Sequence, residues 1–321
     1  MSKQILITGG AGFLGTHSIE KFKSEGFGIT VLDNFSTATI PRNDPLLSNI
    51  LLLSGNILDY KWNDLDHFDL ILHLASPVGP AGILKHSGNM ARYIIEDIYW
   101  AIDGAKHNNC PLIFLSTSEI YGYRSSPVLL KEEDDKVLVG EYKVRNEYSM
   151  SKLTAEIILS NTAKVSDIKY QIIRPFNISG ARQLKTGGFV LPTFMTQALK
   201  NEPITVFGDG SQVRAFTHVK DIVEGIYLTA TTDKLNQIWN IGNKDNINTI
   251  LGLAEMVKKK VANSTSEIVC VDPKTIHGPL YEEAWDKIPN STKISQELGW
   301  TPKYTAEEIV DDVYNYYKSR V

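Results

Sequence analysis

Short apolar runs alternate with longer amphipathic stretches through the first half of the chain, and this alternation constrains the fold most. Runs such as ILIT, ITVL, LILHL and LIFL have the length of buried strands. Between them, stretches such as THSIEKFKSEG and NEYSMSKLTAEIILSNTAK have helical spacing. Strands that alternate with helices favour a parallel sheet covered on both faces, so the sequence predicts an α/β fold.

Composition excludes several classes of protein. The 321 residues are 42% hydrophobic and 22% charged, with a net charge of -4, so bulk charge gives no reason to expect nucleic acid or an anionic membrane as a partner. Cys110 and Cys270 lie far apart without the spacing of a zinc site, which fits a reducing cytoplasm. No signal peptide or membrane-length run is present, so we expect a soluble, cytoplasmic protein. No metal is predicted, and His73, in an apolar run, is expected to be a hydrogen-bonded core residue.

The stretch TGGAGFLG follows the first apolar run and places Gly9, Gly12 and Gly15 before a helix. Glycines at this spacing allow a tight turn, close approach to a pyrophosphate and close packing of helix on strand. Asp33 ends the next run, where a carboxylate accepts hydrogen bonds from the adenosine ribose. Asp33 would repel a 2′-phosphate, and Arg42, the nearest arginine, lies too far along the chain to be relied on. The sequence thus predicts a Rossmann-type doubly wound sheet that binds NAD.

Tyr148 and Lys152 lie four residues apart on a predicted helix and share one face. An ammonium group there can lower the pKa of the phenol by stabilising phenolate, which makes a usable base. The pair alone is weak, because the chain has 14 tyrosines. Combined with the glycine loop and the Ser/Thr-rich end of the run LSTSEIYG, it indicates a catalytic site.

The same stretch, LSTSEIYG, carries a carboxylate, Glu119, directly after a buried run. Two interpretations stay open: Glu119 is a reagent, or it is a loop residue that caps the turn or pairs with Arg124.

The chain resembles the extended short-chain dehydrogenases/reductases of the NAD-dependent nucleotide-sugar epimerase/dehydratase type over nearly its whole length. The motifs that carry the resemblance are TGGAGFLG, VLDNFST, GNILD, HLAS, STSEIYG, YSMSK, RPFNISGAR, ITVFGDGSQVRAF, HVKDIVEGI and IPNSTKISQELGWTP.

The resemblance implies a role for each matching residue. Thr117, Ser118, Glu119, Tyr148 and Lys152 would be catalytic, with Tyr148 taking the proton of the sugar's 4-hydroxyl and Thr117 orienting that hydroxyl. The cofactor would be held by Gly9, Gly12, Phe13, Leu14, Gly15, Asp33, Asn34, Asn56, Ile57, Leu74, Ala75, Ser76, Tyr148, Lys152 and Pro175. The substrate would be held by Asn177, Arg182, Val190, Phe207, Arg214 and Lys287.

Three departures from the family pattern stand out. Asn56 replaces the usual aspartate and keeps an acceptor oxygen. The helix segment that usually reads Asn-Val-x-Gly-Thr is Tyr93 to Asp97, so an asparagine near the nicotinamide is missing. The segment from Pro77 to Gly88, where substrate and nicotinamide would meet, is unlike the family versions.

The resemblance implies an enzyme that transiently oxidises C4 of a nucleotide sugar, with a UDP-sugar favoured. Glu119 favours 4,6-dehydratase or UDP-glucuronate decarboxylase chemistry, because a 4-keto sugar acidifies its C5 proton and makes a C5 carboxylate a β-keto acid. Lys287 weakens the decarboxylase interpretation, since those enzymes carry arginine at the matching position, which grips a carboxylate with two donors. A 4-epimerase, a net NAD-dependent oxidoreductase, and an inactive sugar-nucleotide- or RNA-binding protein are the alternatives.

Domain organisation and assembly are also predicted. Residues 1–175 with about 217–241 would form the NAD-binding domain, and about 176–216 with 242–321 a smaller, discontinuous substrate lobe. The resemblance implies a homodimer, because the helices matching 91–107 and 146–164 pair into a four-helix bundle in this family. The final stretch is predicted to be a helix, from the spacing of Ile309, Val313 and Tyr316 or Tyr317.

Overall fold

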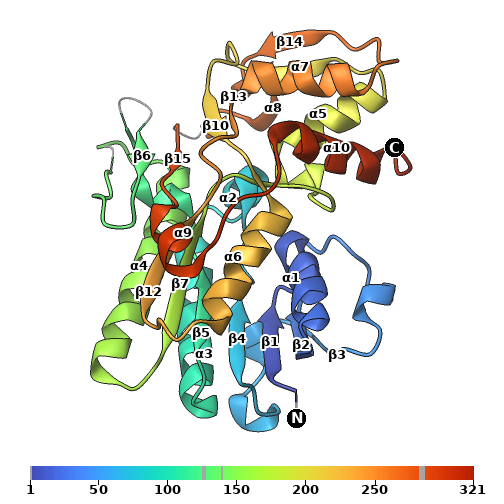
Figure 1. Cartoon of the computed structure of the whole chain (residues 1–321). Helices are drawn as coiled ribbons and strands as arrows, with labels where there is room; N and C mark the ends of the chain where they lie inside the picture. The colour runs from blue at the N-terminus through green and yellow to red at the C-terminus, as the bar shows by residue number, and fades with distance from the viewer. Residues whose placement is uncertain (1, 125–127, 139, 282–285) are drawn as a thin grey trace.

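The computed structural model describes residues 2–124, 128–138, 140–281 and 286–321. Within those ranges, seven parallel strands form one sheet in the order β3, β2, β1, β4, β5, β7, β12, with helices on both faces (Figure 1). The predicted α/β doubly wound sheet is confirmed. The strand order reverses between β1 and β4, and such sheets bind their ligands at the carboxyl ends of the strands beside that reversal. The strands are β1 (Gln4–Thr8), β2 (Gly28–Asp33), β3 (Leu51–Ser54), β4 (Leu70–His73), β5 (Leu112–Leu115), β7 (Tyr170–Pro175) and β12 (Gln237–Ile241).

Both faces of the sheet are buried, which explains why its strands read as continuous apolar runs. Ile5 and Ile7 of β1 pack on one side of the sheet, while Leu6 between them packs on the other. The first face is covered by α1 (Phe13–Ser24), α6 (Val219–Thr231) and α9 (Thr292–Leu298), and the second by α3 (Met90–Asn108) and α4 (Val144–Val165).

A further hydrophobic cluster is formed by later parts of the chain, grouped at the top of the view in Figure 1, away from the N-terminus. The predicted C-terminal helix is α10, which begins at a capping box of Thr305 and Glu308 and buries Ile309, Val313 and Tyr317. The domain boundaries proposed from the sequence stay a prediction. The elements that contribute to this cluster are α5 (Val190–Leu199), β9 (Ile204–Phe207), α7 (Ile250–Lys260), β14 (Ile268–Val271) and α10 (Ala306–Tyr317). The same part of the chain also contains β10 (Val213–Ala215), β13 (Ile247–Thr249) and α8 (Lys274–His277).

Short elements connect the larger helices and strands. The segment from Pro77 to Gly88, which the sequence left without a role, contains the helix α2 (Gly79–Lys85), which contacts α4. The others are β6 (Leu129–Leu130), β8 (Ile178–Ser179), β11 (Thr217–His218), β15 (Ile288–Pro289) and the 3-10 turns η1 (Pro45–Leu47), η2 (Ile57–Asp59), η3 (Trp62–Asp64), η4 (Ser118–Tyr121) and η5 (Lys185–Gly187).

Candidate active site

The glycine-rich loop joins β1 to α1 and fits a dinucleotide phosphate. Gly9 has φ +70°, and a Cβ there would lie 2.9 Å from the backbone nitrogen of Ala75. A Cβ on Gly15 would lie 2.2 Å from the carbonyl oxygen of Gly9, so α1 packs directly on the loop. Gly12 is the N-cap of α1 and has no side chain that could cap the helix. The N–H groups of the first turn, which begins with Phe13 and Leu14, can therefore donate to phosphate oxygens.

Asp33 ends β2 with a buried carboxylate that organises this loop. Its Oδ2 accepts a hydrogen bond from the Ala11 N–H (2.9 Å), and its Oδ1 accepts one from the Phe35 N–H (2.7 Å). Burial raises the pKa of Asp33, while those two donors and the charge of Arg42 act in the opposite direction. Arg42 is closer than the sequence suggested, because its guanidinium carbon lies 4.7 Å from the centre of the Phe35 ring.

The residues predicted for the adenine end lie together beyond Asp33. Asn34 Nδ2 donates a hydrogen bond to Asn56 Oδ1 (2.8 Å), so the amide that replaces the usual aspartate keeps its acceptor role. The Asn56 N–H donates to Asp59 Oδ2 (3.0 Å), and Ile57 beside it is buried.

The end of β4 lies next to the glycine loop. Thr8 Oγ1 accepts hydrogen bonds from the backbone N–H groups of Leu74 and Ala75 (3.2 Å each), and Ser76 follows them. Thr8 Oγ1 also lies 2.9 Å from Nδ1 of His73. Burial lowers the pKa of His73 to about 3, so its ring is neutral, and the predicted core histidine is confirmed.

Tyr148 and Thr117 meet where β5 ends against α4. Their side chains are hydrogen-bonded, and Tyr148 is buried. Burial raises the pKa of Tyr148, as does the charge of Glu119, while Thr117 and the Arg145 cation act in the opposite direction. The phenol is therefore neutral here, and Arg145 is a cation that favours phenolate. The role of Lys152 in activating Tyr148 stays a prediction.

Lys152 turns its ammonium toward the end of β5. Its Nζ donates a hydrogen bond to the carbonyl oxygen of Leu115 (2.9 Å). Burial lowers the pKa of Lys152 to about 8, against the opposing charges of Asp97 and Glu156. Burial raises the pKa of Asp97 to about 7, against the charge of Lys152. Asp97 thus places a titratable acid beside the predicted catalytic lysine, a role the sequence did not assign to it.

Glu119 is held between two cations in the turn that follows β5. Its Oε1 lies 3.1 Å from Nη1 of Arg145 and accepts a hydrogen bond from Nζ of Lys287. The exposed fractions of the three side chains are 12%, 10% and 3%. Burial alone would raise the pKa of Glu119, but Arg145 and Lys287 outweigh it and lower the pKa to about 2. Arg124, the partner considered from the sequence, donates instead to the carbonyl oxygens of Tyr121 and Tyr123.

Lys287 connects this group to the predicted substrate residue Arg214. Lys287 and Arg214 form an isolated parallel bridge, and Nη1 of Arg214 donates to Oδ1 of Asp286 (3.2 Å). Burial lowers the pKa of Lys287, and the charges of Arg145 and Arg214 add to that effect against Glu119. Three predicted site residues, Glu119, Lys287 and Arg214, are thus linked in one chain of contacts.

The other predicted substrate residues contact residues other than Glu119, Lys287 and Arg214. Asn177 Nδ2 donates to the carbonyl oxygen of Ala215 (3.2 Å), and the Phe207 ring packs edge-on against Tyr281. Arg182 forms its ion pair with Glu20 of α1. Ser118 is buried in η4, Pro175 ends β7 and Val190 begins α5.

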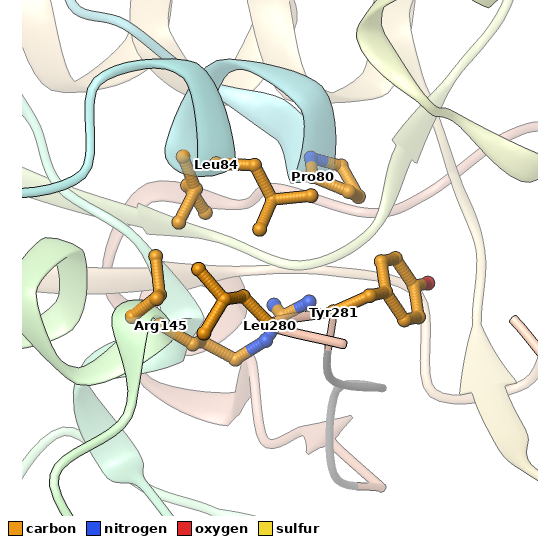
Figure 2. Close-up of a pocket in the computed structure, with 7 residues that line it drawn as sticks. Pro80, Leu84, Arg145, Leu280 and Tyr281 are labelled. Carbon is orange, nitrogen blue, oxygen red and sulfur yellow. The ribbon is translucent and has the colours of Figure 1, made fainter. Parts of the chain in front are cut away.

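A small cavity of about 10 Å³, room for about one water molecule, lies beside Arg145. Figure 2 shows Pro80 and Leu84 of α2 on one side and Arg145, Leu280 and Tyr281 on the other. Apolar side chains therefore cover the Arg145 stem, and such surroundings strengthen an ion pair. Arg145 lies three residues before Tyr148, a helix-face spacing that could have revealed it in the sequence.

Two features are absent from the described residues. Among them, no group of three or more His, Cys, Asp or Glu side chains could hold a metal ion. No helix in the same part of the chain is long and apolar enough to span a membrane.

Known proteins resemble this chain over nearly its whole length. The NAD dependent epimerase/dehydratase family matches residues 5–242. The chain is 30% identical to a UDP-N-acetyl-alpha-D-glucosaminuronate decarboxylase of Bacillus cytotoxicus, over 99% of this chain and 98% of that one. It is also 30% identical to UDP-glucuronic acid decarboxylase 1 of Danio rerio, over 98% of this chain and 72% of that one.

Among solved structures, the UDP-glucose 4-epimerase of Thermotoga maritima with UDP-glucose superposes with a TM-score of 0.86 at 26% identity, covering 98% of this chain and 99% of that one. These findings confirm the predicted fold, the NAD cofactor and the predicted class of enzyme. The chain belongs to the NAD-dependent epimerase/dehydratase family.

Proposed function

We propose that this chain is an NAD-dependent decarboxylase of a UDP-linked uronic acid. The observation that carries the proposal is a pair of buried cations, Lys287 and Arg145, at one oxygen of Glu119. Lys287 alone lacks the two donors of an arginine, which weakened this interpretation from the sequence, but Arg145 supplies a second cation at the same place. The charge of Glu119 in turn raises the pKa of Tyr148, the predicted base, which supports a place for both groups near the reacting end of the sugar. A carboxylate at C5 of a bound sugar would find a cation there. The names of the relatives from Bacillus cytotoxicus and Danio rerio support this choice of substrate class.

The proposed chemistry divides between the residues as follows. Tyr148 takes the proton of the 4-hydroxyl, and Thr117, hydrogen-bonded to it, orients that hydroxyl. Lys152 stays fixed by the carbonyl of Leu115. NAD, when bound, supplies the acceptor and later the donor of the C4 hydrogen, and its positive charge lowers the pKa of a neighbouring phenol. Glycines 9, 12 and 15 with Asp33 would hold the adenosine diphosphate.

Loss of CO2 follows from the 4-keto sugar, which is a β-keto acid. The bond between C5 and the carboxylate breaks, CO2 leaves, and the electron pair forms an enolate between C5 and the C4 oxygen. A proton then adds to C5, and Tyr148 returns its proton when C4 is reduced. The sum is one uronate and one proton converted to one pentose and one CO2, with no net change in the cofactor.

Purified protein incubated with UDP-glucuronic acid or UDP-N-acetylglucosaminuronic acid is expected to release CO2 without accumulating NADH. Product mass and NMR identify the sugar. Unchanged mass with inverted C4 would contradict the proposal and indicate a 4-epimerase, and loss of water would indicate a dehydratase. Accumulation of NADH would indicate a net oxidoreductase.

We also propose a homodimer through α3 and α4. These helices pack against each other and against the sheet. Their outer faces expose large apolar side chains, with Tyr99 of α3 and Ile157 of α4 each 51% exposed. A second copy on this surface would bury them. Light scattering is expected to give a dimer for the wild type and a monomer for Tyr99→Glu/Ile157→Glu, and a monomeric wild type would contradict the proposal.

A further inference from the structure

We propose that Arg145 and Lys287 transfer from Glu119 to the carboxylate of the incoming substrate, and that Glu119, released inside the site, takes up the proton that later adds to C5. This inference rests on the proposed decarboxylation and assigns two tasks within it. Arg145 becomes a specificity-determining residue, and Glu119 becomes the proton donor.

The first support is that a carboxylate receptor already exists at this place. Arg145 reaches Oε1 of Glu119 from the first turn of α4, and Lys287 reaches the same oxygen from beside β15. The protein thus binds a carboxylate of its own with two buried cations. A substrate carboxylate has the same charge and the same acceptor geometry, so it can replace the Glu119 carboxylate as the occupant.

The second support is the other oxygen of Glu119. Oε2 is buried and has no hydrogen-bond partner within the described residues. A protonated carboxyl group needs an acceptor for its proton, and after the exchange the enolate carbon of the substrate is such an acceptor. One oxygen of Glu119 therefore binds the two cations, and the other can carry a proton and donate it to the substrate.

The third support is the charge on Glu119 after the exchange. The charged or titratable groups that act on its pKa are Arg145 and Lys287, with Tyr148 beside them and Arg214 behind Lys287. Burial raises the pKa of Glu119, and Arg145 and Lys287 are what hold the pKa low. Once both cations serve the substrate, burial dominates and the carboxylate binds a proton.

The steps balance. The substrate carboxylate enters with one negative charge, and Glu119 gains one proton from solvent. The C5 bond to the carboxylate then breaks, CO2 leaves, and the electron pair left at C5 takes the Glu119 proton. Glu119 is again an anion and Arg145 and Lys287 return to it, so the site is reset for the next substrate.

Proton uptake is measured by calorimetric titration of NADH-loaded protein, which cannot oxidise the sugar, with UDP-glucuronic acid in two buffers of different ionisation enthalpy. We expect uptake of about one proton per uronate bound near neutral pH. UDP-glucose, which lacks the carboxylate, is expected to bind without uptake. Glu119→Gln is expected to abolish the uptake while the uronate still binds. Binding of the uronate to wild type without proton uptake would overturn the inference.

Selectivity is measured with the same two ligands. Arg145→Gln is expected to weaken the binding of UDP-glucuronic acid by about 10- to 100-fold, because a charge-assisted bond to its carboxylate is lost. The binding of UDP-glucose is expected to weaken by less than about threefold. Arg145→Lys is expected to recover part of the difference. Arg92→Gln is the control, because it removes the same charge from an exposed position on α3. It is expected to leave the affinity for both ligands unchanged. Equal weakening of both ligands in Arg145→Gln would overturn the inference.

The outcomes separate this inference from the proposed function. CO2 release by wild type without proton uptake or carboxylate selectivity at Arg145 would overturn the exchange and leave the decarboxylase standing. Proton-coupled, selective uronate binding without CO2 release would overturn the decarboxylase and leave the exchange standing. If Arg145→Gln does not fold, the wild-type proton uptake still decides the matter.

Discussion

Tyr148→Phe is expected to lower turnover of the uronate by about 10²- to 10⁴-fold, the range that a general base contributes. The substitution removes the oxygen that takes the proton of the 4-hydroxyl and almost no volume. NAD binding is expected to change little, since the glycine loop and Asp33 do not involve the phenol. Single-turnover absorbance of reduced nicotinamide measures the first step directly.

Tyr142→Phe is the matched control. Tyr142 is fully exposed, so this substitution also removes a tyrosine hydroxyl, but from the surface of the protein. Its turnover is expected to equal that of wild type. Turnover of Tyr148→Phe within about threefold of wild type would exclude Tyr148 as the base, since it falls far short of the usual contribution.

The fold could be predicted from the sequence because it depends on local patterns. Continuous apolar runs such as ILIT bury both faces of a parallel strand, and β1 shows this directly, with Leu6 facing α3 and α4 while Ile5 and Ile7 face α1 and α6. The glycine loop was equally accessible, because Gly9 and Gly15 are required by close approaches within one strand-turn-helix unit.

The ion pairs of Glu119 with Arg145 and Lys287 could not be predicted from local patterns in the sequence. Lys287 is 168 residues from Glu119 in the chain, and the bridge that sets it beside Arg214 depends on how distant segments pack. The sequence could name Glu119 and Lys287 from resemblance, but not their contact. Arg145 was missed although its spacing from Tyr148 is local, because an arginine in the first turn of a helix is ordinary at the surface.

Asp97 illustrates a second limit. The sequence showed that residues 93–97 lack the usual asparagine, but it could not show that the charge of Asp97 acts on the pKa of Lys152. Which residues of α3 face α4 depends on the rotation of both helices about their axes, and that rotation is set by packing of the whole layer.

Glu119→Gln is expected to destabilise the substrate-free protein by about 3–5 kcal/mol, the usual cost of removing one partner from a buried ion pair. Glutamine keeps the shape but leaves Arg145 and Lys287 beside each other without the carboxylate that holds them. Urea unfolding at neutral pH measures the loss. Glu119→Gln/Lys287→Met, which removes one cation together with the anion, is expected to recover part of it.

The same change has a defined pH dependence. The folded pKa of Glu119, about 2, lies below its ordinary value of 4.5, so its contribution is fully present above pH 4.5 and is lost as the pH falls toward about 2. The stability difference between wild type and Glu119→Gln is therefore expected to shrink in that window. A difference that stays constant down to about pH 2 would show that the carboxylate charge is not what stabilises the group.

In catalysis the Glu119→Gln variant separates oxidation from the later steps. Tyr148 and Thr117 are intact, so C4 oxidation is expected to proceed, but C5 lacks its proton donor and the reaction stalls. Reduced nicotinamide is expected to persist in a single turnover with UDP-glucuronic acid, with no equivalent build-up in wild type. If the variant behaves like wild type in both phases, Glu119 is a structural residue of the turn. If the first phase is lost as well, the carboxylate organises Thr117 and Tyr148 for oxidation, and its assignment as a proton donor at C5 fails.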